Sequence, residues 1–190
     1  MKIFHSTATT LVVLLFAVAC GPSASDPTER SGLPVGLDGS LPPQTSVPAP
    51  DAVEEAGERG VQAYRQMWTA YATAGTTADW QSPELGRHAT GKALSTLTRT
   101  LFGYHERGIV MRGQPVLTPT VSSVEPAGAP AKVIVSDCGD STNWAKLYAD
   151  TDEPADGEPG GRRHINAVVD KQTDGTWKVT DFGVHEVGTC

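Results

Sequence analysis

The fold is decided by residues 51–74, which read Asp-Ala-Val-Glu-Glu-Ala-Gly-Glu-Arg-Gly-Val-Gln-Ala-Tyr-Arg-Gln-Met-Trp-Thr-Ala-Tyr-Ala-Thr-Ala. Asp51 stands where a helix cap is expected, and Glu54 follows at the spacing of a capping box. Gly57 and Gly60 each weaken such a helix by up to ~1 kcal/mol relative to alanine. Apolar side chains recur at three- and four-residue steps and share one face: Val53, Ala56, Val61, Tyr64, Met67, Trp68 and Tyr71. The stretch therefore predicts a long amphipathic helix.

Two further helices are predicted after the first. Ser82 can cap a short helix that has Pro83 in its first turn, where proline is well tolerated. A longer helix is predicted over residues 90–107, and Gly108 marks its end. The apolar stripe of this longer helix consists of Ala93, Leu94, Leu97, Leu101 and Tyr104.

From Ile109 onward the apolar period changes to two, which is typical of strands. Pro119 is expected at a sheet edge or bulge, and Asp174-Gly175 predicts a two-residue hairpin loop. Helices followed by an antiparallel meander indicate an α+β fold, with helices on one face of a curved antiparallel sheet. The predicted strands are residues 109–111, 116–124, 132–138, 143–149, 163–171 and 176–187.

The N-terminus has the features of a secretory signal peptide over residues 1–19. Lys2 provides the positive start, residues 11–18 are apolar, and small residues lead to Cys20. This apolar run is too short to span a membrane. The sequence Ala17-Val18-Ala19-Cys20 resembles the lipobox of bacterial lipoproteins, in which the cysteine is acylated, for example with palmitate, and becomes the mature N-terminus.

A plain secreted protein is the alternative, because a lipobox prefers leucine where this chain has Ala17, and Ala17-Val18-Ala19 is also an ordinary cleavage site. The cysteine count favours the lipoprotein. The chain has three cysteines, and an odd cysteine is a liability in an oxidising compartment. If Cys20 carries lipid, Cys138 and Cys190 remain as one pair. A structural disulfide is favoured over a redox pair, because their spacing is unlike that of a CxxC motif.

Residues 20–50 are predicted to be a tether between the lipidated cysteine and the folded domain. Seven of the chain's fourteen prolines lie here, with many serines and glycines and no apolar periodicity. Such a segment cannot bury enough apolar surface to offset its ordering entropy. An exposed loop packed on the domain is the alternative. Residues 51–190 are long enough for a single domain with its own core.

The charge of the chain argues against nucleic acid as a partner. The formal net charge is −7, and removal of the signal peptide takes away Lys2 and no acidic residue. Basic residues are adjacent only at Arg162-Arg163. Binding to nucleic acid, or directly to anionic lipid, needs a clustered basic surface.

The order of these elements resembles the NTF2-like, or cystatin-like cone, superfamily. The resemblance rests on the long first helix, the short second one, the third helix beginning Ala89-Thr90-Gly91-Lys92-Ala93-Leu94, and the terminal hairpin Asp174-Gly175-Thr176-Trp177-Lys178-Val179-Thr180-Asp181. More narrowly, the chain is similar to secreted, lipobox-bearing members common in actinobacteria, which often carry a mid-strand cysteine and end in Gly-Thr-Cys, as residues 188–190 do. The superfamily includes enzymes and non-catalytic binding modules, so the fold implies no single activity.

Few residues suggest chemistry. If the hairpin loop has two residues, His164 lies opposite His185 and Val168 opposite Asp181. The apolar residues of the last strand change from odd to even positions, which suggests a bulge near residues 181–183. Two histidines could hold a metal, but no third ligand is evident, so no metal or cofactor is predicted. A pocket enzyme, hydrolase or isomerase, would use Asp181 with His164. Further residues considered for proton exchange are Asp137 and Tyr64.

The sequence is therefore expected to encode a non-catalytic binding or accessory module of the cell envelope, anchored through Cys20 on the extracytoplasmic face of a bacterial membrane. Its partner is expected to be an envelope protein, another envelope component or a small apolar ligand. The aromatic residues Tyr64, Trp68 and Tyr71 are candidates to line a ligand pocket, although such a stripe more often belongs to the core. In a larger assembly, the helix stripe or a sheet edge would be the interface.

Overall fold

The computed structural model describes residues 52–155 and 160–190. The predicted signal peptide, the lipidation site Cys20, the tether and the cap Asp51 lie outside the described residues. The division of the chain into these segments and a domain stays a prediction. None of the described helices is both long and apolar enough to cross a membrane.

The three predicted helices are confirmed. Helix α1 spans Ala52–Gly75, α2 spans Pro83–His88 and α3 spans Gly91–Glu106. Ser82 occupies the N-cap position of α2, but its side chain makes no capping hydrogen bond, so that detail of the prediction is wrong. Gly108 follows α3 and has a φ of +64°, a conformation that glycine adopts without steric cost.

The predicted single meander is wrong, because the strands form two sheets. Strands β2, β3, β5 and β6 form a four-stranded antiparallel sheet in that order, while β1 pairs only with β4. Pro119 precedes β2, so the predicted strand 116–124 is shortened, whereas the predicted strand 132–138 extends to Asp140. The bounds are β1 Ile109–Arg112, β2 Thr120–Glu125, β3 Lys132–Asp140, β4 Ala145–Tyr148, β5 Arg162–Lys171 and β6 Trp177–Val184.

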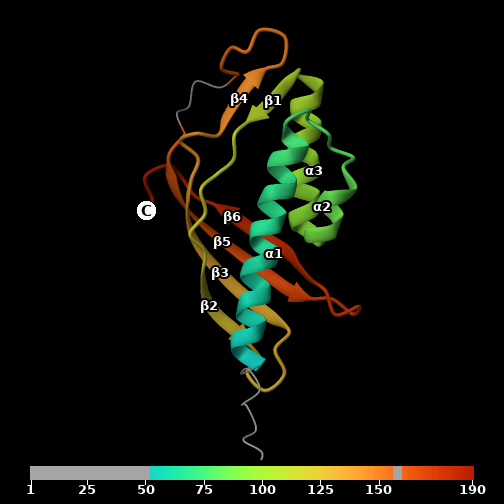
Figure 1. Cartoon of the computed structure of the whole chain (residues 1–190), viewed down its shortest axis with the longest axis vertical. Helices are drawn as coiled ribbons and strands as arrows, with labels where there is room; N and C mark the ends of the chain where they lie inside the picture. The colour runs from blue at the N-terminus through green and yellow to red at the C-terminus, as the bar shows by residue number, and fades with distance from the viewer. Residues whose placement is uncertain (1–51, 156–159) are drawn as a thin grey trace, which may run out of the picture. The chain divides into compact units, whose positions relative to one another are not determined.

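The two sheets and the helices enclose one core. Helix α1 contacts β1 and all four strands of the larger sheet, and α3 contacts β1 and β6. Figure 1 shows α1 lying across the larger sheet, with α2 and α3 beside it and the β1–β4 pair at one end. Inward residues alternate along the central strands, and Val133, Val135, Ile165, Ala167 and Val169 are all buried. The α+β fold predicted from the sequence, with helices packed against antiparallel sheets, is confirmed.

The β5–β6 hairpin contains two irregularities, a longer loop and a bulge, whose effects on the strand register cancel each other. The loop is three residues long, Thr173 to Gly175, because Gln172 N donates to Thr176 O. The predicted two-residue loop is therefore wrong, and it would displace every pair by one. Thr180 is an extra residue in β6, between the pairs Val169↔Val179 and Val168↔Asp181. This bulge restores the predicted opposition of Val168 to Asp181, and it lies just before the predicted position.

The C-terminus is fastened to the sheet by a disulfide. Cys138 in β3 is bonded to Cys190, the last residue, as the cysteine count predicted. Gly188 N donates to Arg162 O at 2.7 Å, and His164 N donates to Thr189 Oγ1 at 2.8 Å. The terminal segment is thus held beside the start of β5.

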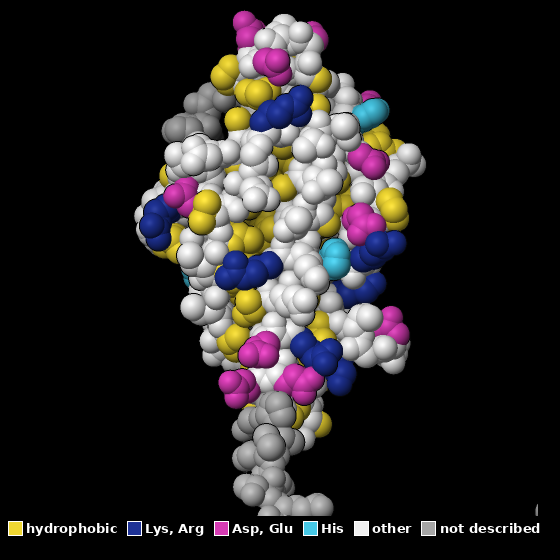
Figure 2. All heavy atoms as spheres, in the orientation of Figure 1, with side chains coloured by type: hydrophobic (Ala, Val, Ile, Leu, Met, Phe, Trp, Pro, Cys, Tyr) yellow, Lys and Arg dark blue, Asp and Glu magenta, His cyan; other side chains and the backbone are white. Residues whose placement is uncertain are grey.

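Charged side chains are mixed in sign on the surface. On the face drawn in Figure 2, lysines and arginines are interspersed with aspartates and glutamates. Three ion pairs among the described residues are exposed to solvent: Arg59–Glu55, Arg87–Glu84 and Lys92–Asp181. Exposed pairs of this kind add little stability.

Candidate ligand pocket

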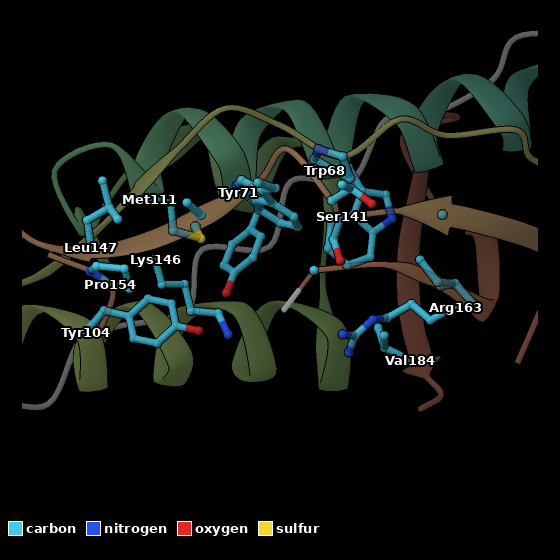
Figure 3. Close-up of a pocket in the computed structure, with 17 residues that line it drawn as sticks. Trp68, Tyr71, Tyr104, Met111, Ser141, Lys146, Leu147, Pro154, Arg163 and Val184 are labelled. Carbon is cyan, nitrogen blue, oxygen red and sulfur yellow. The ribbon is translucent and has the colours of Figure 1, made fainter. Parts of the chain in front are cut away.

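A pocket of about 320 Å³ opens where the small sheet, α1, α3 and the ends of β3 and β5 meet. This volume is at the lower end of the range of small-molecule sites. Figure 3 shows the side chains that converge on it. The lining residues are Trp68, Tyr71, Tyr104, Met111, Pro115, Gly139, Ser141, Thr142, Trp144, Ala145, Lys146, Leu147, Pro154, Gly160, Arg163, Ile165 and Val184.

One wall of the pocket is aromatic. The Trp68 ring meets the rings of Tyr71, Trp144 and Phe182 edge to face, at centroid distances of 6.0, 5.9 and 5.5 Å. Tyr71 and Trp144 meet in the same way at 5.8 Å. Edge-to-face pairs favour one another beyond the area they bury. The wall is therefore a packed, shape-defining surface for an apolar ligand.

The antiparallel pairing of β3 with β5 continues beside the pocket, past the end of β3 and before the start of β5. Ser141 N donates to Gly161 O at 3.0 Å, and the Ser141 hydroxyl both donates to that carbonyl and accepts from Gly161 N. A Cβ on Gly160 would lie 2.1 Å from Ser141 O, so glycine is required by the close approach.

Two buried donors of the pocket have no hydrogen-bond partner among the residues that the structure describes. They are the indole Nε1 of Trp144 and the guanidinium Nε of Arg163. An unsatisfied buried donor carries a desolvation cost, so such groups are rare and call for an explanation. The described residues that line the pocket include no carboxylate. A ligand with an acceptor would satisfy both donors.

Trp68 Nε1 is a third buried donor without a hydrogen bond. It lies close enough to the Tyr64 hydroxyl to favour the ionised phenol slightly, but the two groups do not meet in hydrogen-bond geometry. The indole of Trp68 therefore has a polar neighbour, the Tyr64 hydroxyl, which does not belong to the pocket lining.

Hydroxyl and amine groups lie on the opposite side of the pocket from Arg163. In Figure 3 the side chains of Tyr71, Tyr104 and Lys146 point toward the middle of the pocket, and the Arg163 guanidinium enters from the other side. Burial, with Tyr104 nearby, raises the pKa of Tyr71 well above its ordinary value, so this hydroxyl stays protonated and can donate.

Tyr64 belongs to the core and not to the pocket lining. Its hydroxyl donates to Asp137 Oδ2 at 2.9 Å, and Thr118 N donates to Asp137 Oδ1 at 2.7 Å. Tyr64 and Asp137 are both almost fully buried. Burial, followed by the charge of Asp137, raises the pKa of Tyr64 well above its ordinary value. The structure thus brings two residues considered for proton exchange together, as a satisfied link between α1 and β3.

The other two candidate residues do not meet. Asp181 forms an exposed ion pair with Lys92 at 3.0 Å. His164 Nε2 shares a hydrogen bond of 2.8 Å with Ser136 Oγ, and its ring stacks on His185 at 5.2 Å. Asp181 lies opposite Val168, four residues along β5 from His164, which is roughly 13 Å. Neither residue lines the pocket.

The opposition of His164 and His185 follows the predicted register. His185 also shares a hydrogen bond with Asn166 Oδ1 at 3.0 Å. Within residues 52–155 and 160–190, no group of three or more histidines, cysteines, aspartates or glutamates is placed to hold a metal ion.

Sequence reasoning found part of this lining. Trp68 and Tyr71 were predicted to line a pocket and do so, whereas Tyr64 does not. Arg163 and Trp144 were missed. The period-two pattern of β5 places Arg163 on the same face as Ile165 and Ala167, and an arginine on an inward face is a usable signal.

No protein-family model matches this sequence, and no curated protein matches it. Three solved structures show a weak likeness in fold. The intermembrane space region of chloroplast protein ARC6 is 15% identical, with a TM-score of 0.47 over 67% of this chain and 95% of that chain. A protein from Catenulispora acidiphila is 16% identical, with a TM-score of 0.41 over 70% of this chain and 92% of that chain.

The third structure is ActVI-ORFA from Streptomyces coelicolor. It is 13% identical, with a TM-score of 0.41 over 67% of this chain and 94% of that chain. Likenesses at this level say nothing about activity, because one fold hosts many functions. The α+β fold itself is read from the arrangement of the helices and strands.

Proposed function

We propose that this chain is a non-catalytic binding module that holds a small ligand with an apolar body in the pocket between Trp68 and Val184. The observation that carries the proposal is the aromatic pocket of about 320 Å³, which the fold leaves open. The enzyme alternative is less well supported, because its residues, Asp181 and His164, lie outside the pocket lining and apart from each other.

We further propose that the module works on the extracytoplasmic face of a bacterial membrane, tethered through lipid on Cys20. The apolar run, the small residues before Cys20 and the proline-rich tether support this placement. A lipoprotein of the kind common in actinobacteria agrees with the sequence resemblance. More than one acyl chain on the cysteine gives stable anchoring, where one chain gives only marginal binding.

Filling the mouth of the pocket is expected to abolish ligand binding. Val184 lines the pocket and is 43% exposed, so a Val184→Trp side chain can occupy the entrance without displacing core residues. N-phenyl-1-naphthylamine, a neutral dye that brightens in apolar sites, is a suitable probe. We expect the parent protein to enhance its fluorescence saturably and Val184→Trp to lose at least about tenfold in affinity, as expected when apolar burial is lost.

Val116→Trp is the matched control, because Val116 is 61% exposed and does not line the pocket. It adds the same indole and should bind the dye as the parent does. Equal binding by the parent and both variants would show that the dye sits elsewhere, and absence of dye binding to the parent would contradict the proposed role.

Replacing the predicted lipidation site is expected to release the protein from the membrane. A Cys20→Ala variant cannot be acylated there, so it should move from the membrane fraction to the soluble extracytoplasmic fraction, provided that export is unchanged. Fractionation of producing cells, with detection of a C-terminal tag, measures this. Retention of Cys20→Ala in the membrane fraction to the same extent as the parent would rule out the lipid anchor.

A further inference from the structure

We propose that the ligand carries a carboxylate, which binds between Arg163 and Trp144, on a flat aromatic or otherwise apolar body. This inference deepens the proposed binding function and rests on it. It names the chemical class of ligand from the donors that the fold leaves unpaired in the pocket.

The unpaired buried groups of the pocket are both hydrogen-bond donors. Trp144 Nε1 and Arg163 Nε are donors only, since neither group has an acceptor site. Both atoms are buried and have no partner among the protein groups of residues 52–155 and 160–190. A donor on the ligand would leave them unsatisfied. An acceptor on the ligand removes the cost of burying both.

Arg163 also determines the charge that the ligand is expected to carry. Arg163 brings a permanent positive charge to the pocket, because guanidinium does not lose its proton in proteins. The described lining holds no aspartate or glutamate to balance it. Arg163 is half-buried and its Nε atom is shielded from solvent, so an anionic partner inside the pocket is favoured. The group that meets Arg163 is therefore expected to be anionic.

The shapes of the Arg163 guanidinium and of the aromatic wall indicate the shape of the ligand. A guanidinium is planar and matches the two oxygens of a carboxylate with parallel hydrogen bonds. The rest of the wall is formed by the rings of Trp68, Tyr71 and Trp144, which meet edge to face at 5.8–6.0 Å. Such rings favour a flat or apolar partner. A volume of about 320 Å³ limits the ligand to a small molecule.

Figure 3 shows the side chains between which the two parts of the proposed ligand would lie. The Arg163 guanidinium enters the pocket beside Val184, and Trp68 and Tyr71 come from α1 on the other side. A carboxylate at Arg163 thus leaves the apolar body directed along the aromatic wall, with Tyr104 at the far side.

The test compares acids with their neutral amides, which have almost the same shape. The probes are phenylacetate, indole-3-acetate and 2-naphthylacetate, each paired with its amide, and binding to the mature protein is measured by titration calorimetry. Hydrogen bonds to charged groups are roughly twice as strong as neutral ones. We expect the parent to bind at least one acid about tenfold or more tighter than its amide.

Arg163→Gln is expected to reduce this ratio to about one, because glutamine keeps a donor but removes the charge. Arg162→Gln is the matched control. Arg162 is the neighbouring residue of β5, is exposed and does not line the pocket, so the same loss of charge there should leave the ratio unchanged. Near-ultraviolet circular dichroism identical to that of the parent shows that each variant is folded.

The outcomes separate this inference from the proposed function. Equal binding of acid and amide by the parent, with the neutral dye bound normally, overturns the carboxylate preference and leaves the binding role standing. An acid preference that survives in Arg163→Gln also overturns it. Binding of neither the dye nor any acid or amide overturns both proposals.

Discussion

Removing the disulfide, by Cys138→Ser together with Cys190→Ser, is expected to lower the free energy of unfolding by about 4 kcal/mol. The bond closes a long loop, because the two cysteines are 52 residues apart. In the chain-entropy account, a cross-link stabilises mainly by restricting the unfolded chain, and the effect grows with loop length. For a domain of this size the loss corresponds to a fall in melting temperature of roughly 10–20 °C.

Urea denaturation of the mature protein, followed by circular dichroism, measures the change. The parent treated with a reductant should show the same stability as the double serine variant, since both lack the cross-link. An unfolding free energy within about 1 kcal/mol of the parent's would contradict the account. So would a free thiol found in stoichiometric amount at Cys138 in unreduced, denatured protein.

Gly60→Ala is expected to destabilise the protein by about 1–3 kcal/mol, the usual cost of overpacking a core. By helix propensity alone the same change should stabilise α1 by up to ~1 kcal/mol. Packing opposes this gain, because a Cβ at Gly60 would lie 2.7 Å from both Cβ and Cγ1 of Val133. Val133 is fully buried in the interior strand β3, and its branched side chain is stiff.

Two other helical glycines make a graded control series. A Cβ at Gly57 would lie 3.3 Å from Val121, which is exposed and can move, so Gly57→Ala should be nearly neutral. Gly103 in α3 has nothing within 4 Å of its added Cβ, so Gly103→Ala should stabilise by about 0.5–1 kcal/mol. Equal stability changes at all three positions, measured by urea denaturation, would show that close packing at Gly60 is not limiting.

The helices were predictable because their signals are local. The three- and four-residue steps of apolar side chains in α1, the proline in the first turn of α2 and Gly108 after α3 all act within a few residues of one another. The disulfide was also predictable. The chain has three cysteines, and in an oxidising compartment only Cys138 and Cys190 are left to pair once Cys20 is assigned to lipid. The lipidation itself stays a prediction.

Strand partners were not predictable in the same way. Strands β1 and β4 are four residues long and form a two-stranded sheet apart from the four-stranded one. Alternation of polar and apolar residues tells which face of a strand is buried, but not which strand lies beside it. The glycines of α1 show a related limit, because helix propensity counts Gly60 as unfavourable, whereas the structure shows a close approach of α1 to Val133 of β3 at this residue.

The pocket was only half predictable. The helical stripe gave Trp68 and Tyr71, because one face of a helix stays together in space. It also gave Tyr64, which turned out to be fully buried against Asp137. Trp144 and Arg163 lie on separate segments that line the same cavity, and the ends of the paired strands β3 and β5 lie beside it. Sequence patterns do not give this pairing of distant segments.

The most direct test of the binding account is the response of the four tryptophan indole N–H signals to 2-naphthylacetate, in a ¹H–¹⁵N spectrum of the mature protein assigned with single Trp→Phe variants. Trp144 has a buried indole N–H without a partner, whereas Trp80 and Trp177 do not line the pocket. The account predicts a saturable downfield shift of the Trp144 signal, with those of Trp80 and Trp177 unmoved. A Trp144 signal that stays in place, or equal shifts of all four, would contradict it.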